Sequence, residues 1–446
     1  MEGQICVVAG YGLGHLHPCM ELCKHISSMN YHTTLLFPSI FASAIPPSFL
    51  QRPRSQIVQL TSSGRPMPGS DPLRQQCAED LETHLLNCFE NPDLPTPLCA
   101  IVDFQMGWTK ALFSKFNIPV ISLFTFGACA AAMEWGAWKI QASNITSGET
   151  RVVPGLPEEM ALTYSDLKRK PGGPPKPGDM PRWVPGIEGS IALMFNTCDD
   201  IDGPFIKYIG GQMGLPAWGV GPLLPEQYWK SSELLIRDRE IGEQKRQSSL
   251  TDQNVIQWLD SKPHGSVTYV AFGSEVGPTT EEYQQLAGAL EESTRPFIWV
   301  VQPGSEAHIP QGLDDRVGNR GLIIYGWAPQ LMILSHKSTG GFLSHCGWNS
   351  TMEAIGRGIP FLAWPIRGDQ FFNAKLVVSR LKIGCMVADD LSEIVKKDDI
   401  VKGIESVMGD EEMKKRAEIL SGKFEHGFPA TSVAALEAFS EFISKM

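Results

Sequence analysis

The chain has 446 residues, of which 42% are hydrophobic and 20% charged, a composition typical of soluble globular proteins. Its 38 Lys and Arg residues against 49 Asp and Glu residues leave a formal net charge of −11, which disfavours binding to nucleic acid or to anionic membranes. These values exclude a disordered chain, a collagen and a small disulfide scaffold, and the length predicts two or three domains.

The ten cysteines include no C-x-x-C pair, so neither a zinc site nor a thioredoxin-like motif is indicated. The N-terminal residues lack the basic and apolar regions of a signal peptide, and no run of about 18 apolar residues could span a bilayer. We therefore expect a cytoplasmic protein with reduced thiols. In the cytosol, the glycosylation sequon at Asn144 would be a chance match.

Short apolar runs alternate with helical stretches in the first half of the chain. The expected strands are Ile5–Ala9, Thr33–Phe37, Ala100–Val102, Val120–Phe124 and Ala192–Phe195, and the expected helices are His15–Ser28, Thr109–Lys115 and Gly127–Gln141. Buried strands separated by helices of this length are typical of a parallel sheet covered on both faces.

The same alternation begins again after residue 250. The expected strands are Thr268–Phe272, Phe297–Val301, Leu322–Tyr325, Gly340–Leu343, Phe361–Trp364 and Cys385–Ala388, with a helix at Glu281–Ser293. We therefore predict an α/β protein of two doubly wound, Rossmann-like domains, 1–225 and 253–430. A polar linker at 226–252 joins them, and a final helix covers 431–446. Ligands of such sheets bind beyond the carboxyl ends of the strands, so the cleft between two facing domains is the expected site.

The most informative segment is Trp327 to Gln370. It contains an expected strand, a His345-Cys346-Gly347-Trp348 turn and a helix that starts at Asn349-Ser350. Asn and Ser are favoured at a helix start, and the free N–H groups and partial positive charge there suit a phosphate. The side chain of His345 adds another donor.

Other side chains of this segment can bind the rest of a nucleotide-sugar. Trp327 offers a flat face for a base, and Glu353 a carboxylate for a ribose. Asp369 and Gln370 can together bind adjacent hydroxyl groups of a polyol.

This segment resembles the signature box of the plant UDP-glycosyltransferases, which are inverting enzymes of the GT-B fold. The shared motifs are W-x-P-Q, HCGWNS, a following Glu, WP and the final DQ, all in register. The resemblance implies that the segment binds UDP-glucose, because a final Gln accompanies glucose more often than galactose in the family. The donor-binding residues it implies are Trp327, Ala328, Gln330, His345, Trp348, Asn349, Ser350, Glu353, Asp369 and Gln370.

Three glycines between the first strand and the first helix suggest a close approach to a ligand. A dinucleotide fingerprint would need a third Gly at the position of His15, so that interpretation fails. The family's G-H-x-x-P element matches at Gly14 to Pro18, and the resemblance makes His15 the general base, a role suited to an imidazole. His17 lies about 200° away on the helix, so only one of the two can face the ligand.

Asp103 ends an expected strand, where it can orient His15 and stabilise its imidazolium, or cap the following helix. By resemblance, Ser274 contacts the diphosphate and Thr125 the sugar. The resemblance also implies that the final helix, 431–446, packs back on the first domain. Four aromatic residues could line an apolar acceptor pocket or simply pack in a core: Phe104, Phe126, Trp135 and Trp138.

We therefore expect transfer of glucose from UDP-glucose to a hydroxyl group of a small lipophilic acceptor, a flavonoid or other phenol first and a terpenoid next. The protein would act as a monomer, without a metal or other cofactor. Three alternatives are open: transfer of the sugar to carbon, a silent metabolite-binding protein, and a nicotinamide-dependent oxidoreductase on a similar fold.

Overall fold

A computed structural model describes residues 3–62, 71–168, 178–225, 228–229, 248–274 and 276–446. Contacts divide the chain into two units. The first contains residues 1–128, 181–226 and 428–446, and the second contains residues 129–180 and 227–427. Most of the linker expected at 226–252, and the Pro- and Gly-rich stretch that follows Lys168, lie outside the described residues.

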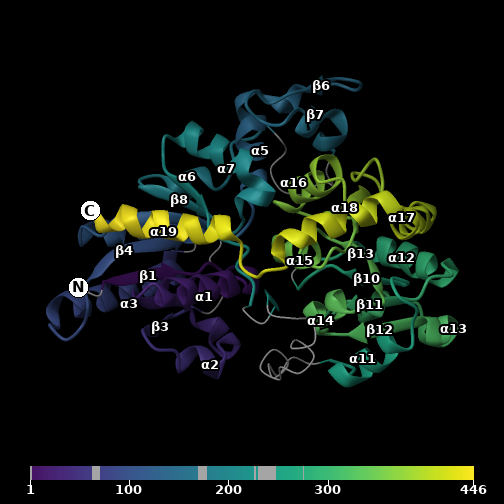
Figure 1. Cartoon of the computed structure of the whole chain (residues 1–446), viewed down its shortest axis with the longest axis horizontal. Coiled ribbons are helices and arrows are strands. Elements are labelled where there is room, and N and C mark those ends of the chain that lie inside the picture. The colour runs from purple at the N-terminus through teal and green to yellow at the C-terminus, as the bar shows by residue number, and fades with distance from the viewer. Residues whose placement is uncertain (1–2, 63–70, 169–177, 226–227, 230–247, 275) are drawn as a thin grey trace. The chain divides into compact units, whose positions relative to one another are not determined.

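The first unit is a seven-stranded sheet in which every neighbouring pair is parallel (Figure 1). In spatial order its strands are β3 (Ser55–Leu60), β2 (His32–Pro38), β1 (Gln4–Val8), β4 (Pro97–Asp103), β5 (Val120–Phe124), β8 (Ala192–Phe195) and β9 (Ala217–Gly219). Its helices are α1 (Leu13–Ser28), α2 (Pro47–Leu50), α3 (Asp71–Glu90), α4 (Lys110–Lys115), α6 (Val184–Ile187), α7 (Asp199–Met213) and α19 (Ala430–Ser444).

Both faces of this sheet are buried. On strand β1, Ile5 and Val7 pack into one apolar core with α1 and α19, whereas Cys6 and Val8 pack into a second core with α3 and α4. Because successive side chains of a strand point to opposite faces, one apolar strand supplies both cores. The sequence of such a strand is therefore a continuous apolar run rather than an alternation.

The second unit is a six-stranded sheet, also parallel throughout. In spatial order its strands are β12 (Gly321–Tyr325), β11 (Phe297–Val301), β10 (Val267–Ala271), β13 (Thr339–Ser344), β14 (Phe361–Ala363) and β15 (Gly384–Met386). Its helices are α11 (Asp252–Asp260), α12 (Thr280–Glu292), α13 (Leu313–Val317), α14 (Gln330–Ser335), α15 (Trp348–Ile355), α16 (Gln370–Lys375), α17 (Lys397–Gly409) and α18 (Glu411–Ser421). The two units are thus two Rossmann-like α/β folds, as predicted.

One segment, residues 129–180, lies within the first domain expected at 1–225. Its contacts group it with the second unit instead. The segment contains most of α5 (Ala128–Lys139) and the hairpin of β6 (Thr150–Arg151) and β7 (Leu162–Thr163). Ion pairs join it to the second sheet's helices and loops: Lys375 to Asp166, Arg380 to Glu159, and Lys168 to Asp390. Such long-range pairs leave no signature in the order of elements along the chain.

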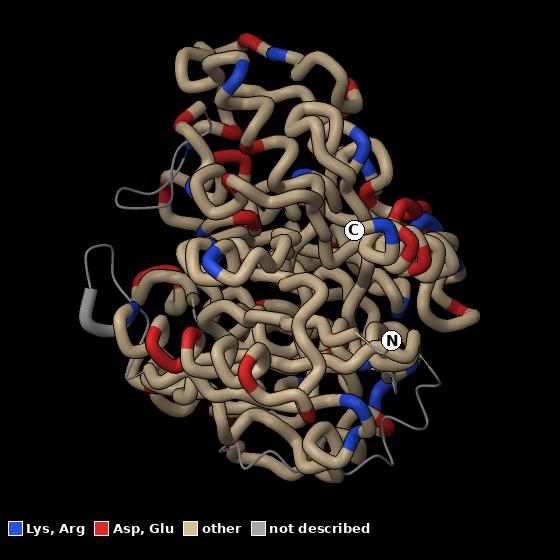
Figure 2. The backbone as a smooth tube through the Cα atoms, turned by 90° about the vertical axis from the view of Figure 1, so that its left-hand side faces the viewer, with Lys and Arg blue, Asp and Glu red and all other residues tan. Residues whose placement is uncertain are grey.

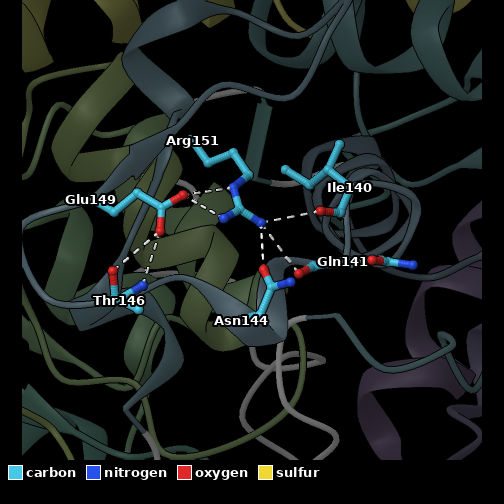
Figure 3. Close-up of polar contacts among 6 residues, drawn as sticks. All are labelled: Ile140, Gln141, Asn144, Thr146, Glu149 and Arg151. Atoms are coloured by element: carbon cyan, nitrogen blue, oxygen red, sulfur yellow. Dashed lines mark hydrogen bonds and ion pairs between the residues drawn. The ribbon is translucent and has the colours of Figure 1, made fainter.

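Arg151 connects the turns that follow α5 (Figure 3). Its guanidinium donates to the carbonyls of Ile140 and Gln141 and to Asn144 Oδ1, the last at 2.6 Å, and it pairs with Glu149. The side-chain oxygen of Asn144, the sequon residue, is therefore engaged within the protein.

Basic and acidic residues are interspersed along the described backbone (Figure 2).

The final helix, α19, is part of the first unit. It packs on α7 and β9, with Phe439 fully buried beside Trp218 at a ring-centroid distance of 6.2 Å. The hydroxyl groups of Tyr31 and Ser440 lie 2.8 Å apart. The C-terminal helix thus completes the core of the first sheet rather than extending the second.

Replacing Phe439 tests this packing. Phe439→Ala should lower the free energy of unfolding by about 3–5 kcal/mol, because it removes a buried ring and leaves a cavity. Val433→Ala, at a position of the same helix that is 44% exposed, should change it by about 0.5 kcal/mol or less. Urea denaturation followed by tryptophan fluorescence measures both, and equal losses would contradict the described packing.

Candidate active site

His15 and Asp103 lie within ion-pair distance of each other at the carboxyl edge of the first sheet. Asp103 is the last residue of β4, and His15 lies in the first turn of α1, which follows the neighbouring strand β1. His15 Nδ1 lies 2.6 Å from Asp103 Oδ2. The carboxylate is fully buried, whereas the imidazole side chain is 18% exposed. The partly exposed His15 ring is thus positioned by the buried Asp103 carboxylate.

Asp103 also begins the 3₁₀ helix Phe104–Thr109, since its Oδ1 accepts the backbone N–H of Gln105 at 2.9 Å. Both predicted roles of this position, N-cap and partner of His15, are therefore found in the geometry. Gly10 makes room for the carboxylate, because a Cβ at this position would lie 2.9 Å from Asp103 Cγ. This close approach accounts for one of the glycines that the sequence singled out.

Thr125 lies beside the same imidazole. Its Oγ1 is 2.8 Å from His15 Nδ1, and its backbone carbonyl accepts a hydrogen bond from Asn196 at 3.1 Å. Asn196 in turn accepts the backbone N–H of Leu223. The sequence grouped Thr125 with the donor-binding residues, and the structure places it against the expected base.

Two of the four aromatic candidates lie near His15. The Phe104 ring is 6.1 Å from the imidazole, and Phe126 meets Phe104 edge-on at 5.5 Å. Both phenylalanines are only half-buried, so they give the expected base an apolar flank that a lipophilic ligand could contact.

The other two aromatic candidates, Trp135 and Trp138, belong to α5 in the second unit. Their rings meet at 5.1 Å, and the Lys139 ammonium lies within 5 Å of both. Trp138 lines an open hollow of about 540 Å³ whose other described lining residues are mainly polar.

In the second unit, Gln330, Ser350 and Glu353 form one hydrogen-bonded group. Gln330 Nε2 donates to Ser350 Oγ at 2.8 Å and to Glu353 Oε2 at 2.6 Å, and Tyr269 Oη donates to Gln330 Oε1 at 3.0 Å. Burial raises the pKa of Glu353 to about 7, partly opposed by the bond from Gln330. Polar groups that a nucleoside could bind are therefore already ordered.

His345 follows β13 and lies against two glycines. A Cβ on Gly273 would come within 2.7 Å of its Nε2, and one on Gly347 within 2.4 Å. Burial lowers the pKa of His345 to about 4, so the ring is neutral at physiological pH. Helix α15 begins at Trp348, one residue before the predicted start, and its N-terminal N–H groups carry partial positive charge.

The loop before α16 is held by Gln370. Its Oε1 accepts the backbone N–H groups of Ile366 and Arg367, each at 2.9 Å, which leaves its amide nitrogen as the group that could meet a ligand. Asp369 Oδ2 accepts a hydrogen bond from Asn373 at 2.7 Å. Asp369 and Gln370, which are both predicted to contact the sugar, are thus adjacent and each is held by a hydrogen bond.

The remaining predicted donor-binding residues lie at the ends of strands of the second sheet. Ser274 is exposed after β10, Trp327 is half-buried after β12 with Ala328 buried beside it, and Trp348 (buried) and Asn349 (half-buried) begin α15. Gln302 stabilises the backbone around Ser274, because its Nε2 donates hydrogen bonds to the carbonyls of Gly273 and Val276.

Three residues that the sequence analysis did not identify support these groups: Gln105, Tyr269 and Gln302. Gln105 Nε2 lies 2.9 Å from His15 Nε2. Only its position two residues after Asp103 could have indicated it. Tyr269 and Gln302 lie on or just beyond neighbouring strands of the second sheet, a relation that appears only once the strand order is known.

Among the described residues, no group of three or more His, Cys, Asp or Glu side chains is placed to hold a metal ion. No helix in that part of the chain has both the length and the hydropathy needed to span a bilayer.

Comparisons with known proteins show the family to which this chain belongs. The family model for UDP-glucoronosyl and UDP-glucosyl transferase matches residues 240–432, which contain the Gln330, His345 and Gln370 groups. The chain is 36% identical over 329 residues to the scopoletin glucosyltransferase of Nicotiana tabacum, covering 71% of this chain and 67% of that protein. It is 30% identical to UDP-glycosyltransferase 73C12 of Barbarea vulgaris, covering 93% of this chain and 90% of that one.

Two solved structures share the fold. UGT73P12 of Glycyrrhiza uralensis, complexed with glycyrrhetinic acid 3-O-monoglucuronide, superposes with a TM-score of 0.82 at 24% identity, covering 100% of this chain and 96% of that one. A UDP-glucosyltransferase from Polygonum tinctorium superposes with a TM-score of 0.77 at 22% identity, covering 100% and 99%. The protein is therefore a UDP-glycosyltransferase of the GT-B fold, and it belongs to the plant UDP-glycosyltransferase family.

The neutrality of His345 can be measured directly. In histidine-labelled protein followed by NMR between pH 5 and 7.5, the His345 ring should keep the shifts of a neutral imidazole, because burial holds its pKa at about 4. The variant His345→Gln assigns the signal by its disappearance. A midpoint near the ordinary value of about 6.5 would contradict the described burial.

Proposed function

We propose that this UDP-glycosyltransferase transfers glucose from UDP-glucose to a hydroxyl group of a small lipophilic acceptor, with inversion at the anomeric carbon. The observation that carries the proposal is the pairing of a partly exposed His15 with the buried Asp103 at 2.6 Å, beside apolar rings. A phenol such as a flavonoid is the favoured acceptor class and a terpenoid the next. The names of relatives that act on small molecules support this class.

On the acceptor side, His15 Nε2 takes the proton of the acceptor hydroxyl, and the oxygen forms a bond to the anomeric carbon. The bond from that carbon to the UDP oxygen breaks on the opposite face, so an α-linked donor yields a β-glucoside. Asp103 stabilises the imidazolium that forms, as the carboxylate of a Ser-His-Asp triad does. A neutral phenol needs such a base, since its own pKa lies near 10.

On the donor side, Trp327 stacks on the uracil, and Gln330 and Glu353 bind the ribose. The diphosphate gains negative charge as it leaves. It is met by the N-terminus of α15 and by donors from His345, Asn349, Ser350 and Ser274, an arrangement that stabilises developing charge. Asp369 and the amide nitrogen of Gln370 bind the glucose hydroxyl groups. We propose that no metal ion is needed, and that the enzyme acts as a cytoplasmic monomer.

Two variants at histidines of the same helix test whether His15 is the general base. His15→Ala should lower kcat by about 10² or more, the loss expected for a general base, while UDP binding measured by calorimetry stays within twofold. His17→Ala, two residues further along the same helix, should keep most of the activity. Equal activity of the two variants would show that His15 is not the base.

Glu353 makes UDP binding depend on pH. Ribose hydroxyl groups donate hydrogen bonds, so they favour the ionised carboxylate, and burial raises the pKa of Glu353 to about 7. Binding releases its proton, and UDP affinity should rise about threefold or more between pH 6 and pH 8.

The variant Glu353→Gln lacks the titration of Glu353, whereas the titration of the UDP phosphate groups affects both proteins equally. Its affinity measured by calorimetry should rise less steeply over the same range. The same slope in both proteins would contradict a role of Glu353 in binding the ribose.

A further inference from the structure

Gln105 is tied to the His15–Asp103 pair through its own backbone. Its N–H donates to Asp103 Oδ1 at 2.9 Å, while the other oxygen of that carboxylate lies 2.6 Å from His15 Nδ1. One buried carboxylate therefore positions both residues. The half-buried side chain of Gln105 returns towards the imidazole, where its Nε2 lies 2.9 Å from His15 Nε2.

The hydrogen-bonding groups around Gln105 determine which way its amide points. The backbone N–H of Tyr11 lies 3.3 Å from Oε1, and since an N–H only donates, the atom facing it must be the oxygen. The amide nitrogen then faces His15, and it too can only donate. His15 Nε2 must therefore be the accepting, unprotonated nitrogen, and the ring proton lies on Nδ1 facing Asp103.

This arrangement occupies the nitrogen that a general base uses. An acceptor hydroxyl can reach Nε2 only by replacing the amide N–H of Gln105 on it. A displaced amide would remain close, because the backbone N–H of Gln105 donates to Asp103 Oδ1, and its N–H groups could then reach an atom next to the bound hydroxyl. The neighbouring rings of Phe104 and Phe126 carry no polar group that could take over this role.

We propose that Gln105 is a specificity-determining residue: it caps the base in the free enzyme, and once displaced it donates to a second oxygen of the acceptor. The acceptors it selects carry that oxygen on the carbon next to the reacting hydroxyl, as in catechols, ortho-methoxyphenols and vicinal diols. This inference rests on the proposed function, and it narrows the acceptor class from phenols in general to those with two adjacent oxygen atoms.

A pair of acceptors and one variant test this selection. A hydroxycoumarin with a methoxy group next to its hydroxyl is compared with the same compound without the methoxy group. Their Kd values are measured by fluorescence titration in the presence of UDP, and their kcat and KM with UDP-glucose. The native enzyme should favour the first by about five- to tenfold in Kd, the value of one hydrogen bond. Gln105→Met, similar in size but without the amide, should reduce the ratio to within twofold.

A second variant tests the orientation of the amide. Gln105→Glu places a carboxylate against Nε2, which holds a proton on that nitrogen and removes the base, so kcat at pH 7 should fall at least tenfold below that of Gln105→Met. A merely structural role would make the two variants similar. Equal kcat values, or an unchanged ratio of Kd values in Gln105→Met, would overturn the proposal.

Failure of the proposed function has a different outcome. A protein that transfers no sugar to either compound, but whose Kd ratio depends on Gln105, would refute sugar transfer to phenols and support the selective cap. A protein that transfers glucose with the same preference in both native and Gln105→Met forms would refute the cap alone.

Discussion

The buried charge of Asp103 is the constraint on which the arrangement around His15 depends. A fully buried carboxylate without partners would cost several kcal/mol, and the chain supplies two partners for it, one from the start of α1 and one from the backbone that follows β4. His15 lies 2.6 Å away, the N–H of Gln105 donates to the second oxygen, and Gly10 leaves room for both.

The register of two parallel strands makes this arrangement possible. Val8 of β1 pairs with Val102 of β4, so the two strands end side by side, one leading into the helix of His15 and the other into Asp103. The pairing of His15 with Asp103 also sets the tautomer of His15. An imidazole whose Nδ1–H faces a carboxylate presents an unprotonated Nε2, and the interactions of Gln105 require the same tautomer. An unprotonated Nε2 on His15 therefore follows from the need to satisfy one buried charge.

Burial acts differently in the second unit. There it holds His345 neutral and raises the pKa of Glu353 to about 7, so that this carboxyl is only partly ionised near neutral pH. Glycines at 273 and 347 let backbone pass close to the imidazole, and the start of α15 adds oriented N–H groups. A diphosphate would meet groups that are already aligned.

Local pattern predicted most of the elements, because short apolar runs that alternate with helices are compatible with few architectures besides a parallel sheet covered on both faces. Strands such as Val120–Phe124 and Phe297–Val301 agree with the structure at both ends, and the helix expected at Asn349 begins one residue earlier. The proximity of His15 to Asp103 could be predicted because both lie at the carboxyl edge of one parallel sheet.

Features that depend on long-range side-chain geometry could not be predicted. Residues 129–180 group with the second unit, to which they are joined by ion pairs with residues some 210 to 220 positions away, such as Lys375–Asp166. The amide of Gln105 could be oriented only once Tyr11 and His15 were seen on either side of it. Likewise, the use of the Gln370 oxygen to hold its own loop has no signature in the DQ motif.

The central claim, metal-independent transfer of glucose to a small acceptor, is tested most directly by one mass-spectrometric assay with EDTA present. The protein is incubated with UDP-glucose, UDP-galactose or UDP-glucuronate and a panel of flavonoids, simple phenols, triterpenoids and steroids. The account predicts a phenol heavier by one hexose, formed with UDP-glucose, whose fragmentation shows an oxygen-linked sugar. No product from any donor although UDP binds, or a product formed only when a divalent metal is restored, would contradict it.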